Sequence, residues 1–221
     1  MKHVVIDLEM NNTCKKPGER RKCSMETIEI GAVMLDDNLN EVSSFRTYVK
    51  PEFNDGVVKK ITKLTGITTE MVENAPRFNE ALRMFTSWCL GTDDEVTIYA
   101  WSQSDYAQVS KEMVVKGYEL SYEEVVLFDT EWFDFQQEFD TNLGFERQLS
   151  LNFALEMAGV DFAGHRHNAL DDARNTAELF RIFKDEELFE KTLRKIRDAM
   201  VPTPLGNTIG NMVDFSKFVS A

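Results

Sequence analysis

Along this chain, the pattern of apolar residues changes from one typical of consecutive strands to one in which strands and helices alternate. Three segments near the N-terminus are rich in β-branched and aromatic residues and are separated by polar, turn-forming stretches. They are residues 3–10, 28–35 and 42–49. We expect them to form three antiparallel strands, followed by a helix over Phe78–Leu90, where apolar side chains recur at helical spacing.

In the rest of the chain, short apolar runs and amphipathic stretches follow one another. The predicted strands are residues 96–99 and 125–128, and the predicted helices are residues 105–116, 132–139, 149–158, 169–183 and 188–200. Antiparallel strands that lead into parallel βα units indicate an α/β fold with a mixed sheet flanked by helices. We expect one domain over residues 1–200 and a poorly patterned C-terminal tail over residues 201–221.

The cysteines and the N-terminal residues indicate the cellular compartment of the protein. The three cysteines, Cys14, Cys23 and Cys89, cannot all pair, and none has the spacing of a zinc site. A reducing, intracellular compartment follows from this usage. No apolar run resembles a signal peptide or reaches the length of a membrane span. We therefore expect a cytoplasmic protein with no membrane partner.

The formal net charge of −13 argues against nonspecific binding to nucleic acid, because phosphates are held mainly by clustered lysine and arginine. This argument weakens if some of the acids bind cations, which reverse the local field. The distribution of the charge therefore matters more than its total.

Two carboxylates stand two residues apart in the first predicted strand. Alternate side chains of a strand share a face, so Asp7 and Glu9 project together. An arbitrary pair of this kind marks a solvated strand end, but the apolar run Val4–Ile6 and the following Met10 indicate a buried strand. Buried carboxylates are costly unless they bind a cation, and hard oxygen ligands favour Mg²⁺ or Mn²⁺.

Two further segments carry acids at predicted helix starts. Asp105 follows a predicted strand and opens a helix, where an acid also stabilises the helix dipole without any metal. In the stretch 164–173, where a loop gives way to a helix, two histidines lie beside two acids. Each segment alone is compatible with a purely structural role.

Together, these segments resemble the DEDDh branch of the DnaQ-like 3′–5′ exonucleases, whose fold is RNase H-like. The first motif of that branch is D-x-E, the second is an aspartate at a helix start, and the third is H-x₄-D. The matching residues are Asp7, Glu9, Asp105, His167 and Asp172. Counting five residues from His165 reaches Leu170, so His165 and Asp171 are second choices.

The likeness extends over residues 3–184 and includes the segments 28–33, 48–51, 64–67 and 162–176. Within the superfamily, the chain is most similar to small exoribonucleases that trim RNA 3′ ends, including those related to the sporulation inhibitor KapD. The resemblance implies that residues 1–200 are an exonuclease domain that releases nucleoside 5′-monophosphates, with single-stranded RNA as the expected substrate.

The resemblance also implies the roles of the motif residues. Asp7, Glu9, Asp105 and Asp172 would hold two Mg²⁺ or Mn²⁺ ions per site, directly or through water, and His167 would take a proton from the attacking water. Two such ions about 3.5–4 Å apart activate water and stabilise the departing oxygen. Glu29, on the second strand, is interpreted as supporting the site without binding metal.

Candidates for substrate binding lie close to these motifs. A dense basic stretch follows the first strand and is able to grip phosphates or to remain simply solvated; it contains Lys15, Lys16, Arg20, Arg21 and Lys22. Met10 and Trp101 are candidates to pack on the terminal bases, since base stacking contributes about 1–3 kcal/mol per base. Core packing is the alternative for both residues.

Two other functions share the same sequence features. A binding or regulatory protein can keep this fold without chemistry, although it would then be expected to lack one of the five catalytic side chains. A DNA proofreading or repair exonuclease would carry the same catalytic set. The sequence does not distinguish RNA from DNA, and it leaves the oligomeric state and any protein partner open.

Overall fold

The computed structural model describes residues 1–13, 23–92, 94–128 and 132–200. Five strands form one mixed sheet in the order β3-β2-β1-β4-β5. The strands are β1 (Lys2–Asn12), β2 (Met25–Leu35), β3 (Glu41–Tyr48), β4 (Val96–Ala100) and β5 (Phe133–Asp134). The first three are antiparallel neighbours, whereas β4 pairs in parallel with β1 and β5 in parallel with β4. This confirms the predicted α/β fold with a mixed sheet.

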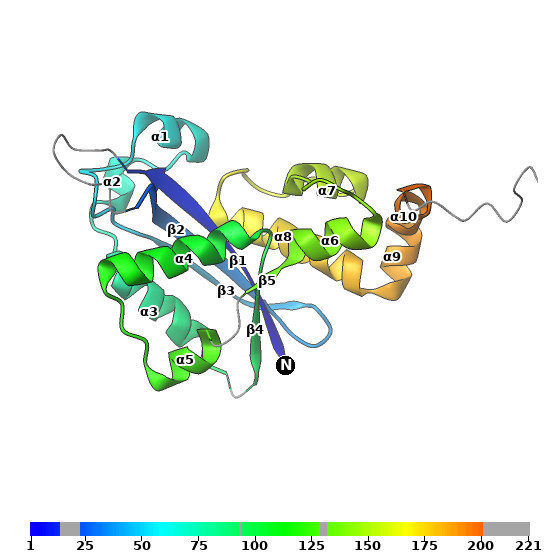
Figure 1. The fold of residues 1–221 in the computed structure, drawn as a ribbon, viewed down its shortest axis with the longest axis horizontal. Helices are drawn as coiled ribbons and strands as arrows, with labels where there is room; N and C mark the ends of the chain where they lie inside the picture. The colour runs from blue at the N-terminus through cyan, green and yellow to red at the C-terminus, as the bar shows by residue number, and fades with distance from the viewer. Residues whose placement is uncertain (14–22, 93, 129–131, 201–221) are drawn as a thin grey trace, which may run out of the picture.

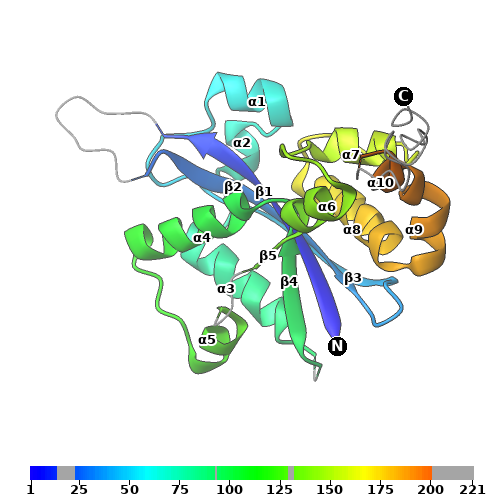
Figure 2. The same cartoon turned by 45° about the vertical axis from the view of Figure 1, so that its right-hand side comes forward.

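The helices divide between the two faces of the sheet and one end (Figures 1 and 2). One face packs on α3 (Phe78–Cys89), α4 (Gln103–Lys116) and α5 (Tyr122–Phe128). The other packs on α6 (Phe135–Leu143), α7 (Leu151–Met157), α8 (Ala169–Lys184), α9 (Glu186–Thr192) and α10 (Arg194–Met200). The short helices α1 (Lys59–Thr65) and α2 (Thr69–Val72) pack beside Ile28 of β2.

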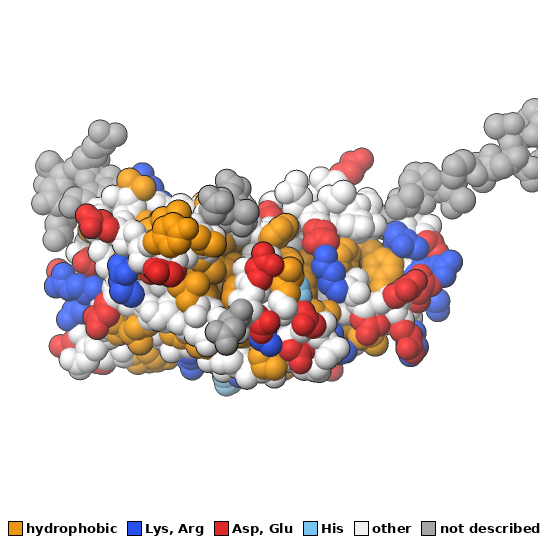
Figure 3. Space-filling model, turned by 90° about the horizontal axis from the view of Figure 1, so that it is seen from below, with side chains coloured by type: hydrophobic (Ala, Val, Ile, Leu, Met, Phe, Trp, Pro, Cys, Tyr) orange, Lys and Arg blue, Asp and Glu red, His pale blue; other side chains and the backbone are white. Residues whose placement is uncertain are grey.

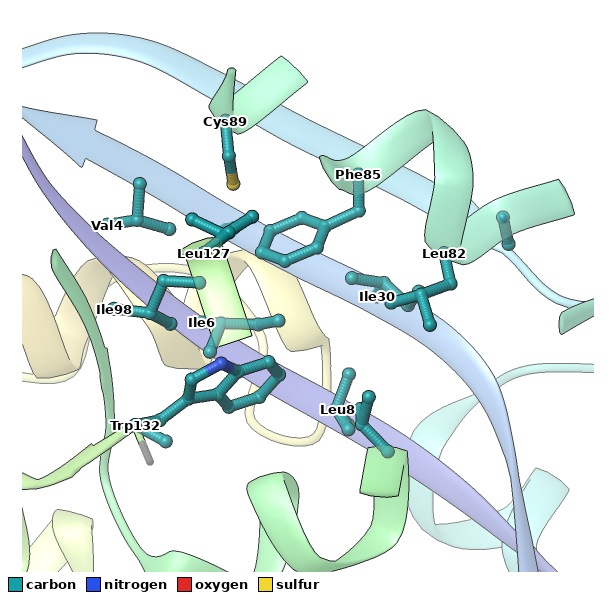
Figure 4. Close-up of a cluster of buried hydrophobic side chains, with 14 of the residues drawn as sticks. Val4, Ile6, Leu8, Ile30, Leu82, Phe85, Cys89, Ile98, Leu127 and Trp132 are labelled. Carbon is teal, nitrogen blue, oxygen red and sulfur yellow. The ribbon is translucent and has the colours of Figure 1, made fainter. Parts of the chain in front are cut away.

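Alternation along β1 assigns its side chains to two different cores. Val4, Ile6 and Leu8 point into the cluster with α3, and Figure 4 shows them in a row below Cys89, Phe85 and Leu82 of that helix. Val5 faces the opposite cluster, which includes α6, α7 and α8. Because Asp7 and Glu9 share the parity of Val5, they continue its row on the α8 face. The fold therefore places both carboxylates under α8.

One predicted strand is wrong. Residues 125–128 belong to α5, because the side chain of Glu124 accepts a hydrogen bond from the Ser121 N–H, and the Ser121 hydroxyl accepts one from the Glu124 N–H. This reciprocal cap starts a helix just before a run whose composition alone favours a strand. The fifth strand is instead β5, a two-residue segment that lies within the predicted helix 132–139.

Other boundaries differ in smaller ways. The predicted helix 188–200 is two helices, and Asp185 caps the first of them by accepting the Leu188 N–H. The helices α1 and α2 were not predicted. Among the described residues, none of the helices combines the length and the apolar character that crossing a bilayer requires. The division into a domain and a tail stays a prediction, since residues 201–221 lie outside the described part of the chain.

Candidate active site

The site is built on the last part of β1. In the antiparallel register with β2, Asp7 lies opposite Gly31 and Glu9 opposite Glu29. The register shifts between Glu9 and Met10, and such an irregularity bends a strand and re-aims its side chains. Glu9 is 8% exposed. Two carboxylates, the half-buried Asp7 and the buried Glu9, are thus held close together, as the D-x-E spacing predicts.

The third carboxylate comes from the first turn of α8. Asp172 lies beside Asp7 and Glu9, and one ligand oxygen from each of these three residues lies within 4.8 Å of the other two. This close approach depends on Gly31, because a Cβ there would lie 2.2 Å from the Leu170 backbone nitrogen and 2.3 Å from the Ala169 carbonyl carbon. The absent side chain lets the helix N-terminus rest directly on β2.

Asp105 lies in the first turn of α4, whose N-cap is Ser102. Its Oδ1 accepts a hydrogen bond of 3.2 Å from the Leu8 N–H, so it lies directly beside the strand between Asp7 and Glu9. It is buried, and its charge raises the pKa of Asp7. Asp105 nevertheless stands outside the group of three that has oxygens within 4.8 Å.

The loop before α8 distinguishes the two histidine–aspartate registers. Asp171 is engaged within the loop, because its Oδ2 accepts the His165 N–H at 2.8 Å. Asp172 instead faces Asp7 and Glu9, and the backbone N–H of His167 donates to its carboxylate. His167 has φ 62, a left-handed conformation that is uncommon for residues other than glycine. Its side chain is exposed, and it interacts electrostatically with Asp172.

The electrostatics of these acids are unfavourable without a cation. Burial, reinforced by Asp105, Asp172, Glu9 and Glu29, raises the pKa of Asp7 well above its ordinary range. Burial is also the main reason that the pKa of Glu9 rises to about 8, with neighbouring carboxylates adding to it. The pKa of Asp105 rises to about 7 because of burial, although the Leu8 N–H opposes the shift.

The donor set fits a hard divalent cation. Asp7, Glu9 and Asp172 offer only carboxylate oxygens, which is the chemistry that Mg²⁺ and Mn²⁺ prefer. The ion pairs found among the described residues include none with these three acids, so no lysine or arginine in that part of the chain neutralises them through an ion pair. Raised pKa values on convergent carboxylates are typical of functional sites.

The proposed substrate contacts are placed less completely. Trp101 is 8% exposed and packs against Phe135 and Phe139, as the core-packing alternative expects. Met10 is partly buried against the α3-side core, next to the strand irregularity. The basic residues Lys15, Lys16, Arg20, Arg21 and Lys22 lie outside the described residues.

One polar contact at the site was not predicted. Arg46 of β3 donates from Nε to Glu29 at 2.6 Å, and the other Glu29 oxygen accepts the Ala169 N–H at 3.1 Å. The spacing of the motifs gives no signal for Arg46, because it becomes a neighbour only through the pairing of β2 with β3.

Comparison with known proteins agrees with this geometry. The solved nuclease domain of 3′hExo, a DEDDh family member bound to rAMP, superposes with a TM-score of 0.70 at 24% identity, over 81% of this chain and 90% of that one. The fold is thus RNase H-like, of the class found in DEDDh nucleases. The model of the exonuclease family (RNase_T) matches residues 4–180, and the chain belongs to that family.

Curated relatives are similar over most of this chain. The ERI1 exoribonuclease 2 of Xenopus laevis is 29% identical over 198 residues, which are 80% of this chain and 27% of the relative. The 3′-5′ exoribonuclease 1 of Homo sapiens is 28% identical over 184 residues, which are 79% of this chain and 50% of the relative. The chain thus spans half or less of the length of these relatives.

Proposed function

We propose that this protein is a metal-dependent 3′–5′ exonuclease that hydrolyses phosphodiester bonds at the 3′ ends of RNA and releases nucleoside 5′-monophosphates. The observation that carries the proposal is the convergence of Asp7 and Glu9 of β1 with Asp172 of α8, whose oxygens lie within 4.8 Å of one another. Membership of the exonuclease family supports the reaction class.

The carboxylates supply a cation-binding cage. Asp7, Glu9 and Asp172 would hold the metal, and Asp105, which is hydrogen-bonded to the intervening backbone of β1, would complete the set. Bound divalent ions, of which we propose two Mg²⁺ or Mn²⁺, would supply electrostatic stabilisation of the charge that develops on the phosphate. The protein contributes by fixing the positions of the acids before the substrate arrives.

His167 is the proposed general base. Its side chain is exposed beside the acids, and its backbone is tied to Asp172, so it can accept a proton from a water that approaches the cluster. Only the neutral imidazole accepts that proton, so activity depends on the histidine being deprotonated. His165 is a weaker candidate because its backbone is bound to Asp171, which turns away from the cluster.

RNA is the proposed substrate because relatives of this chain are named exoribonucleases. We further propose that the RNA is single-stranded and that the protein acts in the cytoplasm. The net charge of −13 repels the phosphates of RNA, so binding requires local positive charge. On the face drawn in Figure 3, basic side chains lie in separate groups among acidic ones. Substrate attraction is therefore assigned to bound cations and to the basic segment around Lys15 and Arg20.

The test is digestion of matched substrates by metal-stripped protein with and without added Mg²⁺ or Mn²⁺. We expect single-stranded RNA with a free 3′ end to be shortened stepwise, and EDTA to stop the reaction. Faster loss of the matched DNA strand would favour the proofreading or repair alternative. Substrate binding without cleavage in the presence of either metal would identify a catalytically silent regulator and overturn the proposal.

A further inference from the structure

Glu29 is a buried carboxylate whose two oxygens are bound by two different elements. The residue is 0% exposed and lies on β2 directly opposite Glu9 of β1. Its Oε1 accepts the Arg46 Nε–H at 2.6 Å, and its Oε2 accepts the Ala169 N–H at 3.1 Å. A single side chain thus connects β3 to the first residue of α8 through the strand that adjoins the site.

The position of this contact along α8 determines what it controls. Ala169 is the first residue of the helix, two residues after His167 and three before Asp172. Gly31, on the same strand as Glu29, lets the backbone of Ala169 and Leu170 approach β2. The backbone at Gly31 thus lies in close contact with the start of the helix, and the Glu29 carboxylate binds the first N–H of that helix.

We propose that Glu29, paired with Arg46, is a positioning residue that holds the N-terminus of α8 so that Asp172 and His167 face Asp7 and Glu9. This inference rests on the proposed function. It assigns Glu29 no contact with substrate or metal. The pair instead sets the geometry of the two motif residues that arrive from a distant part of the chain.

The chemistry of the contact requires a carboxylate. Both partners of Glu29 are donors, namely the Arg46 guanidinium and the Ala169 N–H. A glutamine has only one acceptor oxygen, so its NH₂ group would face one of these donors. Glu29→Gln therefore removes one of the two bonds while conserving the shape of the side chain, and it leaves either the buried Ala169 N–H or the partly exposed Arg46 guanidinium without its acceptor.

The reading of Glu29 as a further metal ligand is less favourable. Both of its oxygens already accept hydrogen bonds from protein donors, and it is absent from the group formed by Asp7, Glu9 and Asp172. A ligand role also predicts a different response to the loss of Arg46. Removing the arginine would free a ligand and strengthen metal binding, whereas a positioning role predicts that metal binding weakens.

The experiment compares Glu29→Gln with a control variant in another ion pair that also joins β3 to α8. Arg174 of α8 pairs with Glu41 of β3 at 2.9 Å, but this pair is solvent-exposed and lies farther along the helix. We expect Glu29→Gln to lower kcat about 10- to 100-fold, with a smaller change in KM, and to weaken Mn²⁺ binding by a similar factor. Arg174→Gln should leave both quantities within about twofold, as expected for an exposed pair.

Two arginine variants keep the proposal testable if Glu29→Gln does not fold. Arg46→Gln should lower kcat and weaken Mn²⁺ binding in the same direction as Glu29→Gln, and Arg46→Lys, which keeps the charge, should restore much of the loss. Equal kcat and Mn²⁺ affinity in folded Glu29→Gln and Arg174→Gln would overturn the proposal. Tighter Mn²⁺ binding by Arg46→Gln would overturn it in favour of the ligand reading.

The failure of the proposed function is distinguishable from the failure of this inference. If wild-type protein binds Mn²⁺ but digests no RNA, the function is wrong, and the Mn²⁺ titrations still test Glu29. If wild-type protein binds no Mn²⁺, amide hydrogen exchange over residues 165–172 tests the positioning role of Glu29 instead. Faster exchange there in Glu29→Gln than in Arg174→Gln would support the positioning role, and equal exchange would contradict it.

Discussion

At the scale of single residues, a general base and a metal ligand should fail in different ways. His167 is exposed beside the acids, whereas Asp7 belongs to the group whose oxygens converge within 4.8 Å. Loss of the His167 side chain removes a proton acceptor, whereas loss of the Asp7 side chain removes a negative charge from the metal-binding site. These defects are separable by measuring turnover and metal binding on the same variants.

His167→Ala should reduce kcat by about 10²–10⁴-fold, the range of positioned acid–base catalysis, while Mn²⁺ and RNA binding persist. The pH dependence of kcat should differ between wild type and this variant, because the variant has no imidazole to accept the proton. Asp7→Ala should weaken Mn²⁺ binding as well. Steady-state kinetics across pH, with Mn²⁺ titrations, check both. Near-wild-type turnover in His167→Ala, with a large loss in His165→Ala, would show that the register is wrong.

At the scale of elements, the approach of α8 to β2 depends on one missing side chain. Gly31→Ala would place a Cβ 2.2 Å from the Leu170 nitrogen, and backbone atoms cannot yield as a flexible side chain does. Such overpacking costs about 1–3 kcal/mol of folding free energy. We expect Gly31→Ala to lower the thermal midpoint and to reduce kcat more than the stability loss explains, since α8 carries Asp172.

Gly91→Ala is the matched control for this prediction. A Cβ at Gly91 would lie 3.4 Å from the nearest carbonyl oxygens, which is close to ordinary contact. Thermal melts and single-turnover rates of both variants give the comparison. Equal rates in folded Gly31→Ala and Gly91→Ala would remove helix placement from the explanation of catalysis.

The segment after β1 carries a separate prediction about substrate attraction. Replacing Lys15, Lys16, Arg20, Arg21 and Lys22 by glutamine should weaken RNA binding and flatten its dependence on salt, because fewer counterions are released. Turnover at saturating RNA should change less. Binding isotherms at several salt concentrations measure the slope, and a slope that stays as in wild type would exclude this segment from the binding surface.

Helices and strands were predictable from the sequence where the apolar pattern continued over several turns and the capping residues were evident. The helix from Ala169 was predicted because its apolar stripe continues over several turns. The run 125–128 was assigned wrongly because four apolar residues fit a strand or a helix, and only the cap between Ser121 and Glu124 decides. At the site, strand alternation predicted the convergence of Asp7 and Glu9. The contact of Arg46 with Glu29 could not be predicted, because it forms only when β2 pairs with β3.

At the scale of the whole molecule, the buried acids link stability to pH. The pKa of Glu9 rises in the folded state from its ordinary value of 4.5 to about 8, mainly because of burial. The folded state therefore binds more protons than the unfolded state between these values, and ∂ΔG/∂pH of unfolding is negative there. The contribution of Glu9 is fully present below pH 4.5 and is lost as pH rises through about 8.

We therefore expect this group to make the metal-free protein less stable as pH rises from 5 to 8, while the stabilisation by added Mg²⁺ or Mn²⁺ grows over the same range. The ions compete with protons for the same oxygens, so binding should release protons. Thermal melts with EDTA or metal, together with calorimetry in buffers of different ionisation enthalpy, measure both effects. A Glu9→Gln variant should flatten the difference, and a metal-induced gain that is independent of pH in wild type would contradict the linkage.

The contact between Glu29 and Ala169, which spans 140 residues of sequence, also has a consequence for synthesis. Asp7 and Glu9 are translated well before Asp172 and the helix that carries it. A nascent chain that ends before His167 holds only part of the carboxylate cluster and lacks the proposed base. Nuclease activity should therefore begin only when α8 has emerged and docked, so that a partly made chain cannot degrade the RNA from which it is being translated.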